Sequence, residues 1–233
     1  MASSRFRMRS VDSDGAMKIG VFYQDNGPQS RVHVDLARRM IESARRVMPG
    51  IEIHHLTDDK SEVLPEVDGV YRIGGNLPMA VRRVTHHGSR MGDWAFVDTD
   101  VIFRKDVRDV FDDPFDVALT DRIGTDMEGT PFAQAMPYNM GVTFSRNPLF
   151  WAVANIHLKA LASKDQQWMG DQEVVCAMAR HSERLPGRAG FNIKILPGRI
   201  YNYPPASETD DYSHAAIVHF KGGERKRMMG SAS

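Results

Sequence analysis

One stretch near the middle of the chain constrains the fold more than any other. Residues 94–97 form a short apolar run, which is typical of a strand buried on both faces of a largely parallel sheet. Two carboxylates, Asp98 and Asp100, end this run, and a second apolar triplet, 101–103, follows them. Carboxylates so close to a core are costly unless a cation neutralises them, and hard cations such as Mg²⁺ or Mn²⁺ prefer oxygen ligands. An isolated pair of this kind is more often two surface residues in a turn, but the apolar flanks and the polar residues further along favour a metal site.

Strands and helices alternate along the rest of the chain. Apolar runs predict strands at 18–23, 51–56, 70–73, 115–120, 140–144, 193–196 and 216–220. Helical patterns precede Pro49-Gly50, span 79–91, follow Asn147-Pro148 and run from about 170 to 180. This alternation predicts a single α/β domain with a mostly parallel central sheet flanked by helices. We expect the domain to span 17–227, between flexible ends at 1–16 and 228–233.

Composition argues against several classes of function. The chain has 233 residues, enough for one α/β domain with a full core or for two small domains at most. Lys and Arg number 30 and so do Asp and Glu, so the zero net charge gives no general case for nucleic acid or an anionic membrane as partner. The one cysteine, Cys176, permits no intrachain disulfide, and no apolar run is as long as a membrane span. The first 16 residues lack the apolar core of a signal peptide, so we expect a cytoplasmic protein.

Further polar features accompany the two aspartates. Asp171-Gln172 opens a helix, where a carboxylate is common in any protein. Asn139 precedes a strand, which alone indicates only a turn. Arg82 lies on the helix before the central strand and could contact a nucleotide or a sugar; the alternative is a charged residue on the solvated face of that helix. His219 ends a strand, and the loop after it has glycines that let a backbone approach a phosphate and cations that could bind one. The alternative for this last segment is a basic tail.

Two pairs of adjacent histidines, His54-His55 and His86-His87, could suggest metal ligands. Neighbouring residues on a strand point to opposite faces, so we interpret His54 and His55 as structural or surface residues. We expect His86 and His87 to lie on the surface of their helix.

The order of these features resembles a GT-A glycosyltransferase, most of all the retaining enzymes related to glycogenin and to the bacterial lipopolysaccharide galactosyltransferases of glycosyltransferase family 8. The resemblance runs from about residue 18 to residue 226, through short motifs separated by sequence that does not align by eye. The Asp-x-Asp motif of the family matches Asp98 and Asp100. Its metal-binding pattern, His-aromatic-x-Gly-x-x-Lys, matches His219, Phe220 and Gly222.

The remaining family motifs match with some departures. The Asn that precedes Ser-Gly-Val in the family matches Asn139, with Met140 in place of Ser, and the family Asp-Gln matches Asp171-Gln172. A family Asp beyond the central strand fits Asp121, and a basic residue one helix earlier fits Arg82. The family Lys falls on Arg225, the Pro-Trp that commonly follows is absent, and Trp168 is near a position where some members carry an acceptor-side carboxylate.

The resemblance implies a GT-A fold and a hexosyltransferase that moves a sugar from a nucleotide-sugar donor, most simply a UDP-sugar, with retention of configuration. The acceptor would be a glycan, a lipid-linked saccharide or a small molecule. Mn²⁺ or Mg²⁺ would be held by Asp98, Asp100 and His219, and Asp171 and Gln172 would be the catalytic residues. The donor-binding residues implied, including those beyond the end of the first strand, are Tyr23, Asp25, Arg82, Asp98, Thr99, Asp121, Asn139, Lys221, Gly222, Arg225 and Lys226.

Two alternatives stay open. Residues 98–102 also imitate the nucleophile motif of haloacid-dehalogenase phosphohydrolases, although that family has the motif near its N-terminus. It also has a later Gly-Asp-x-x-x-Asp, in which Val175 stands here in place of the second Asp. The other alternative is a non-catalytic module that binds a nucleotide-sugar or a glycan on the same fold. A sugar-phosphate nucleotidyltransferase would need a Gly-rich basic loop after the first strand, which residues 24–29 lack.

Overall fold

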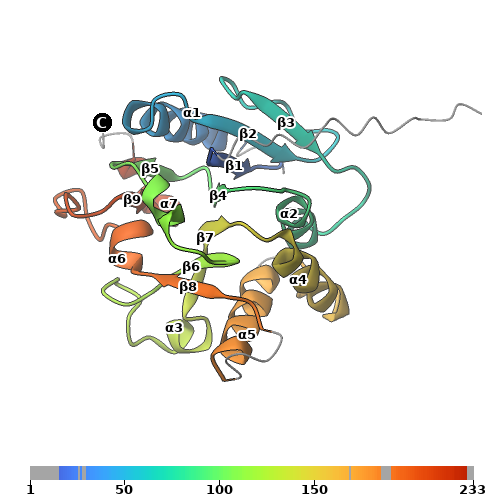
Figure 1. The fold of residues 1–233 in the computed structure, drawn as a ribbon. Coiled ribbons are helices and arrows are strands. Elements are labelled where there is room, and N and C mark those ends of the chain that lie inside the picture. The colour runs from blue at the N-terminus through green and yellow to red at the C-terminus, as the bar shows by residue number, and fades with distance from the viewer. Residues whose placement is uncertain (1–15, 26, 28–29, 168, 185–189, 230–233) are drawn as a thin grey trace, which may run out of the picture.

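The computed structural model describes residues 16–25, 27, 30–167, 169–184 and 190–229, and a sheet of seven strands forms its centre (Figure 1). All neighbouring strands of this sheet pair in parallel except β7, which is antiparallel to β4 and to β6. The predicted α/β class with a mostly parallel sheet is confirmed. In spatial order the strands are β3 (Gly69–Arg72), β2 (Glu52–Thr57), β1 (Lys18–Phe22), β4 (Trp94–Val97), β7 (Tyr138–Ser145), β6 (Val117–Asp121) and β8 (Ile193–Leu196).

The helices begin and end at residues that suit those positions. Asn147 caps one of them by accepting a hydrogen bond from the backbone N–H of Leu149 at 3.0 Å, and Pro148 is its first residue. Gly50 follows another in a left-handed conformation with φ 79°. The helices are α1 (Ser30–Val47), α2 (Met79–Gly88), α3 (Pro131–Ala135), α4 (Pro148–Ala160), α5 (Gly170–Arg184), α6 (Gly198–Tyr201) and α7 (Gly223–Met228), with a 3₁₀ helix at Arg108–Asp112.

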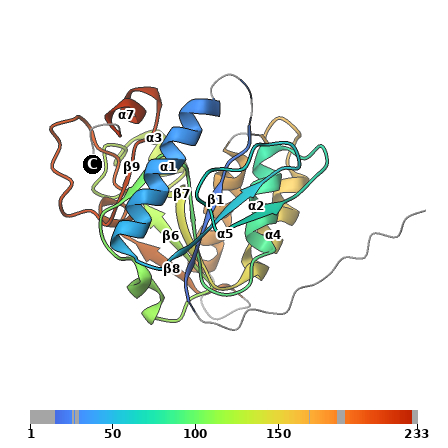
Figure 2. The same cartoon turned by 90° about the horizontal axis from the view of Figure 1, so that it is seen from above.

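Two apolar cores cover the two faces of the sheet. On the central strand, Trp94 and Phe96 belong to one core and Ala95 and Val97 to the other, because successive side chains of a strand point to opposite faces. Figure 2 shows α1 on one side of the sheet and α2 and α4 on the other; α5 shares their core. All four side chains of β4 are therefore buried, which explains the unbroken apolar run in the sequence.

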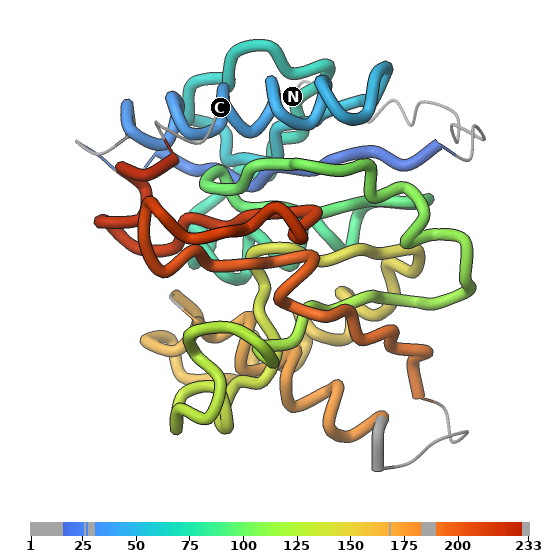
Figure 3. Tube along the Cα trace, turned by 90° about the vertical axis from the view of Figure 1, so that its left-hand side faces the viewer, coloured from blue at the N-terminus to red at the C-terminus, as the bar shows by residue number. Residues whose placement is uncertain are grey.

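A small second sheet covers the same face as α1. It pairs β5 (Val101–Phe103) with β9 (Ile217–His219) in antiparallel register, with Val101 opposite His219. Figure 3 faces this side and shows the C-terminal segment, in red, lying below the blue helix α1. This pairing places His219 beside the end of the Asp98–Asp100 segment.

Some expectations from the sequence are wrong. His86 and His87 are 0% and 1% exposed, because α2 packs between the sheet and α4, and the imidazole of His87 stacks on Phe96 with 3.8 Å between ring centroids. The expected domain end at 227 falls inside α7, and Met229 is buried in the core. Of the expected flexible segments 1–16 and 228–233, residues 1–15 and 230–233 lie outside the described residues, as does Trp168. In the described part of the chain, no helix is long and apolar enough to cross a bilayer.

Candidate active site at the carboxyl edge of the sheet

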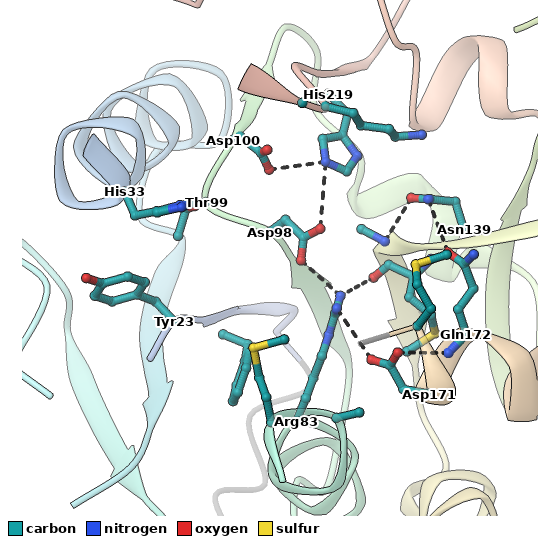
Figure 4. A pocket seen from close by; sticks show the side chains of 18 of the residues that line it. Tyr23, His33, Arg83, Asp98, Thr99, Asp100, Asn139, Asp171, Gln172 and His219 are labelled. Atoms are coloured by element: carbon teal, nitrogen blue, oxygen red, sulfur yellow. Dashed lines mark hydrogen bonds and ion pairs between the residues drawn. The ribbon is translucent and has the colours of Figure 1, made fainter. Parts of the chain in front are cut away.

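A pocket of about 670 Å³ opens where the carboxyl ends of β1 and β4 meet the first residues of β7. Because β7 runs antiparallel to β4, its N-terminal residues lie at the same edge as the residues that follow β4. The start of α5, the end of β9 and one face of α2 complete the wall (Figure 4). Ligands of open α/β sheets bind at this kind of edge.

Three of the predicted residues, Asp98, Asp100 and His219, form a cluster that lines this pocket. The Nε2 atom of His219 lies 3.1 Å from Asp100 Oδ1 and 3.7 Å from Asp98 Oδ2. One ligand atom from each of the three residues lies within 4.8 Å of the others. His219 and Asp100 are 3% and 6% exposed, so their polar atoms are largely withdrawn from water.

The tautomer of His219 follows from its neighbours. The backbone N–H of Gly141 donates to Asn139 Oδ1 at 2.9 Å, which identifies that atom as the amide oxygen. The Asn202 atom that lies 2.8 Å from the same oxygen must then be Nδ2, a donor. Asn202 therefore turns its Oδ1 toward His219 Nδ1, at 2.8 Å, and Nδ1 carries the proton. Nε2 is the ring nitrogen that faces the two aspartates and that would serve as a metal ligand.

This arrangement fits a divalent cation. Two carboxylate oxygens and the ring nitrogen Nε2 face one another in a buried site, and a cation bound between them would neutralise the carboxylates. Burial would raise the pKa of the Asp100 carboxyl, but His219 and Lys226 outweigh it and hold that pKa well below its usual range, so Asp100 is ionised. Two carboxylates and one imidazole suit ions such as Mn²⁺ or Mg²⁺ better than a soft metal.

Gly141 makes room for this histidine. A Cβ atom at position 141 would lie 2.1 Å from Cε1 of His219 and 2.6 Å from its Nδ1, so any side chain there would displace the imidazole. The sequence places this glycine next to Asn139 on β7, but nothing local indicates that a ring from β9 packs on it.

Arg83, which the sequence did not single out, connects the cluster to the start of α5. Its guanidinium lies 2.9 Å from Asp98 Oδ1 and 3.5 Å from Asp171 Oδ2, and it donates to the Met140 carbonyl at 2.5 Å. Burial would lower the pKa of Arg83, but the charges of Asp98 and Asp171 raise it. Burial also raises the pKa of the Asp171 carboxyl, which the charge of Arg83 opposes. Figure 4 shows Arg83 reaching between the two carboxylates.

Asn139 and Gln172 form a second polar group beside Asp171. Asn139 Nδ2 donates to Gln172 Oε1 at 3.3 Å, and the Met140 backbone N–H donates to the same oxygen at 3.3 Å. Asn202, also missed by the sequence analysis, joins Asn139 to the cluster and donates to Thr120 Oγ1 at 2.7 Å. An isolated asparagine between two tyrosines offers no sequence signal for this role.

Tyr23 and Thr99 lie at the opposite end of the pocket, where Figure 4 shows them beside His33. The rings of Tyr23 and His33 stack with centroids 6.1 Å apart, and His33 Nδ1 lies 3.2 Å from Thr99 Oγ1. Tyr23, which follows the end of β1, thus forms part of the pocket wall.

The basic segment after β9 also lines the pocket, through Lys221, Gly222, Arg225 and Lys226. Lys226 Nζ lies 3.4 Å from Asp100 Oδ2, and Arg225 forms an ion pair with Asp126. Burial lowers the pKa of the Lys221 ammonium to about 7, and the nearby guanidinium of Arg122 acts in the same direction.

Three predicted donor-binding residues are not among those that line the pocket. Arg82 donates to the carbonyls of Ile73 and Gly75 and to Gln24 Oε1, so its guanidinium supports neighbouring loops. The Asp121 carboxylate accepts from the Gly198 and Ile123 backbone N–H groups, which anchors the start of α6. The Asp25 carboxylate accepts from the backbone N–H of Gly27 in a turn. Of the two adjacent arginines, Arg83 is the one that lines the pocket.

No protein-family model and no curated protein sequence matches the chain. Solved structures do match it. A glycosyltransferase involved in the glycosylation of the major capsid of PBCV-1 superposes with a TM-score of 0.58 at 16% identity, covering 91% of this chain and 99% of that one. The galactosyltransferase LgtC, solved with donor and acceptor sugar analogues, superposes with a TM-score of 0.55 at 14% identity, covering 92% and 96%. The bifunctional glycosyltransferase WbbM superposes with a TM-score of 0.57 at 12% identity, covering 92% of this chain and 47% of that one. The chain therefore has the GT-A fold of these glycosyltransferases.

Proposed function

We propose that this protein is a metal-dependent glycosyltransferase that takes a sugar from a nucleotide-sugar donor, most simply a UDP-sugar. The observation that carries the proposal is the buried cluster of Asp98, Asp100 and His219, whose acceptor atoms face one another in a pocket at the carboxyl edge of the sheet. The fold shared with glycosyltransferases supports the same conclusion.

Each end of the pocket has chemistry suited to one part of the donor. Tyr23 and His33 present aromatic faces on which a nucleotide base could stack. Mn²⁺ or Mg²⁺ held by the cluster would supply Lewis-acid stabilisation of the charge on the leaving diphosphate. Lys226 and Lys221 would bind the diphosphate oxygens from the side of α7.

Asp171 and Gln172 would act at the sugar. Positive charge develops on the ring as the bond to the diphosphate breaks, and a carboxylate held nearby stabilises it. The charge of Arg83 opposes the rise in the pKa of Asp171 that burial causes, and the guanidinium lies 3.5 Å from Asp171 Oδ2. Retention of configuration, which the resemblance implies, would follow if the acceptor attacks from the face of the sugar that the diphosphate leaves.

Thermal unfolding with UDP, GDP and ADP, each with and without Mn²⁺, tests the donor site. A ligand that binds only the folded state raises the melting temperature by mass action. We expect UDP to do so only with Mn²⁺, and we expect the shift to disappear in Asp100→Ala but to persist in Asp109→Ala, an exposed aspartate outside the pocket. No shift with any nucleotide would refute the proposal.

Turnover is tested separately with Asp171→Asn. Release of UDP from a panel of UDP-sugars should fall at least about a hundredfold, since electrostatic groups of this kind contribute on that scale, while UDP binding stays near that of the unaltered protein. Binding without turnover in the unaltered protein would instead identify a non-catalytic nucleotide-sugar-binding module.

A further inference from the structure

The contacts place the polar groups of the pocket in order. Tyr23, His33 and Thr99 lie at one end, the Asp98, Asp100 and His219 cluster lies in the middle, and Asn139, Asp171 and Gln172 lie on the other side (Figure 4). If the donor occupies this line with its base at Tyr23 and its sugar near Gln172, the wall beyond Gln172 faces the acceptor.

Arg122 belongs to that wall. It follows β6, it lines the pocket, and its Nε donates to the Met136 carbonyl at 2.8 Å. The sulfur of the same methionine lies 3.2 Å from Gln172 Nε2. Arg122 is therefore linked through Met136 to Gln172, at the sugar end of the pocket.

The charge of Arg122 is not neutralised by any described residue at ion-pair distance. The residue is 5% exposed, and its guanidinium lies over the ring of Phe132 with 4.9 Å to the centroid. Arg83, by contrast, faces two carboxylates in the same pocket, and Asp126, whose charge acts on Arg122, is paired with Arg225. A buried cation without a counter-charge is costly.

An anion bound beside Arg122 would relieve the cost of burying its charge. The planar fork of a guanidinium also suits two oxygens of one phosphate or carboxylate.

We propose that the acceptor carries an anionic group, a phosphate or a carboxylate, that pairs with Arg122. This inference rests on the proposed function and names the class of its second substrate. The diphosphate of the donor is a weaker candidate, because the proposed function already pairs it with Lys226 and with the cation at the Asp98, Asp100 and His219 cluster, whereas Arg122 is linked to Gln172.

Calorimetry on the protein loaded with UDP and Mn²⁺ tests the proposal. Loading occupies the diphosphate site, so that an added anion reports on the acceptor side alone. The probes are glucose 6-phosphate, glucuronate and uncharged glucose. We expect at least one of the two anionic sugars to bind at least about tenfold more tightly than glucose, which corresponds to about 1.4 kcal/mol, and the stronger of the two identifies phosphate or carboxylate.

Variants assign the preference to Arg122. Arg122→Gln should remove the preference for the anionic probe and leave UDP affinity within about twofold, whereas Arg122→Lys should keep part of it because the charge remains. Arg90→Gln is the matched control, since Arg90 also lies over an aromatic ring, Tyr71, but outside the pocket. Equal binding of glucose and both anions, or an unchanged preference in Arg122→Gln, would overturn the inference.

The two proposals fail in different ways. If the unaltered protein does not bind UDP, the proposed function fails, and the anionic probes are then titrated into the unloaded protein. Anion binding that depends on Arg122 would still support an anion site there, and its absence would remove that site as well.

Discussion

Replacement of Asn202 by leucine tests whether this residue positions His219 for metal binding. Asn202 is 1% exposed and makes three side-chain hydrogen bonds, to His219, Asn139 and Thr120, at 2.7–2.8 Å. Leucine has a similar volume, so Asn202→Leu removes these bonds without opening a large cavity. The role of Asn202 is to position His219 rather than to touch the metal.

The expected loss of stability follows from the partners left behind. The Nδ1–H of His219 becomes a buried donor without an acceptor, which costs about 1–3 kcal/mol. Loss of the other two bonds costs about 1 kcal/mol each, since Asn139 Oδ1 still accepts from Gly141. We expect the free energy of unfolding without metal to fall by about 3–5 kcal/mol. The imidazole is then free to turn, and loss of such a partner typically weakens metal binding by about 10–100-fold.

Two measurements separate these effects. Urea unfolding without metal reports stability, and calorimetric titration of the folded variant with Mn²⁺ reports affinity. The Mn²⁺ affinity also sets the stability at saturating Mn²⁺, because a tenfold weaker affinity removes about 1.4 kcal/mol of the stabilisation that the ion provides. Asn202→Asp is the control, since its carboxylate still accepts from His219 but no longer donates to Asn139 or Thr120.

Asn202→Asp should therefore lose stability and keep Mn²⁺ affinity within about threefold. If Asn202→Leu binds Mn²⁺ as tightly as the unaltered protein, Asn202 does not orient His219 and the reasoning is refuted. An equal loss of affinity in both variants would mean that the site was disturbed as a whole.

Three further predictions concern neighbouring features. Gly141→Ala should push His219 aside and weaken Mn²⁺ binding at least about tenfold, measured by the same titration, and unchanged affinity would contradict the close contact. Arg83→Met leaves the carboxylates of Asp98 and Asp171 without the guanidinium between them, so the free energy of unfolding at pH 7 should fall by about 3 kcal/mol. Saturating Mn²⁺ should restore part of this loss. A loss of stability that Mn²⁺ does not reduce would count against the cluster as a cation site. Burial lowers the pKa of His55 and of His86 to about 4, so the unfolded chain takes up protons first and stability should fall from pH 6.5 toward pH 4 by about 1.4 kcal/mol per pH unit for each. Urea titrations across that range check this, and His86→Gln should show a shallower slope.

The elements of the fold were largely predictable because the signals that specify them are local. The run at 94–97, with every side chain apolar, indicated a strand buried on both faces, and β4 is such a strand. Asn147 and Pro148 indicated the start of a helix, and α4 begins there. The boundary at 91 was wrong, since α2 ends at Gly88.

The residues of the site could be predicted where they belong to a sequence motif, but not where only tertiary packing brings them together. Asp98 and Asp100 lie within one short segment, and His219 was found only through the resemblance to a family. The resemblance to the family indicated Arg82, whereas the adjacent Arg83 lines the pocket, and adjacent residues of a helix point about 100° apart. The rotation of α2 against the sheet and α4 decides which of them enters the pocket, and it also buries His87.

By itself, the sequence determined the class of fold, the strand that carries Asp98 and Asp100, and the acidic and basic groups available for a site. Those properties depend on residues that are close in the chain. Only the tertiary structure decided that β9 pairs with β5, which brings His219 to Asp100 across more than a hundred residues, and that Asn202 holds Nδ1 of His219 so that Nε2 faces the aspartates. Pairing register and buried hydrogen bonds depend on partners that meet only when the chain has folded, so no local pattern encodes them.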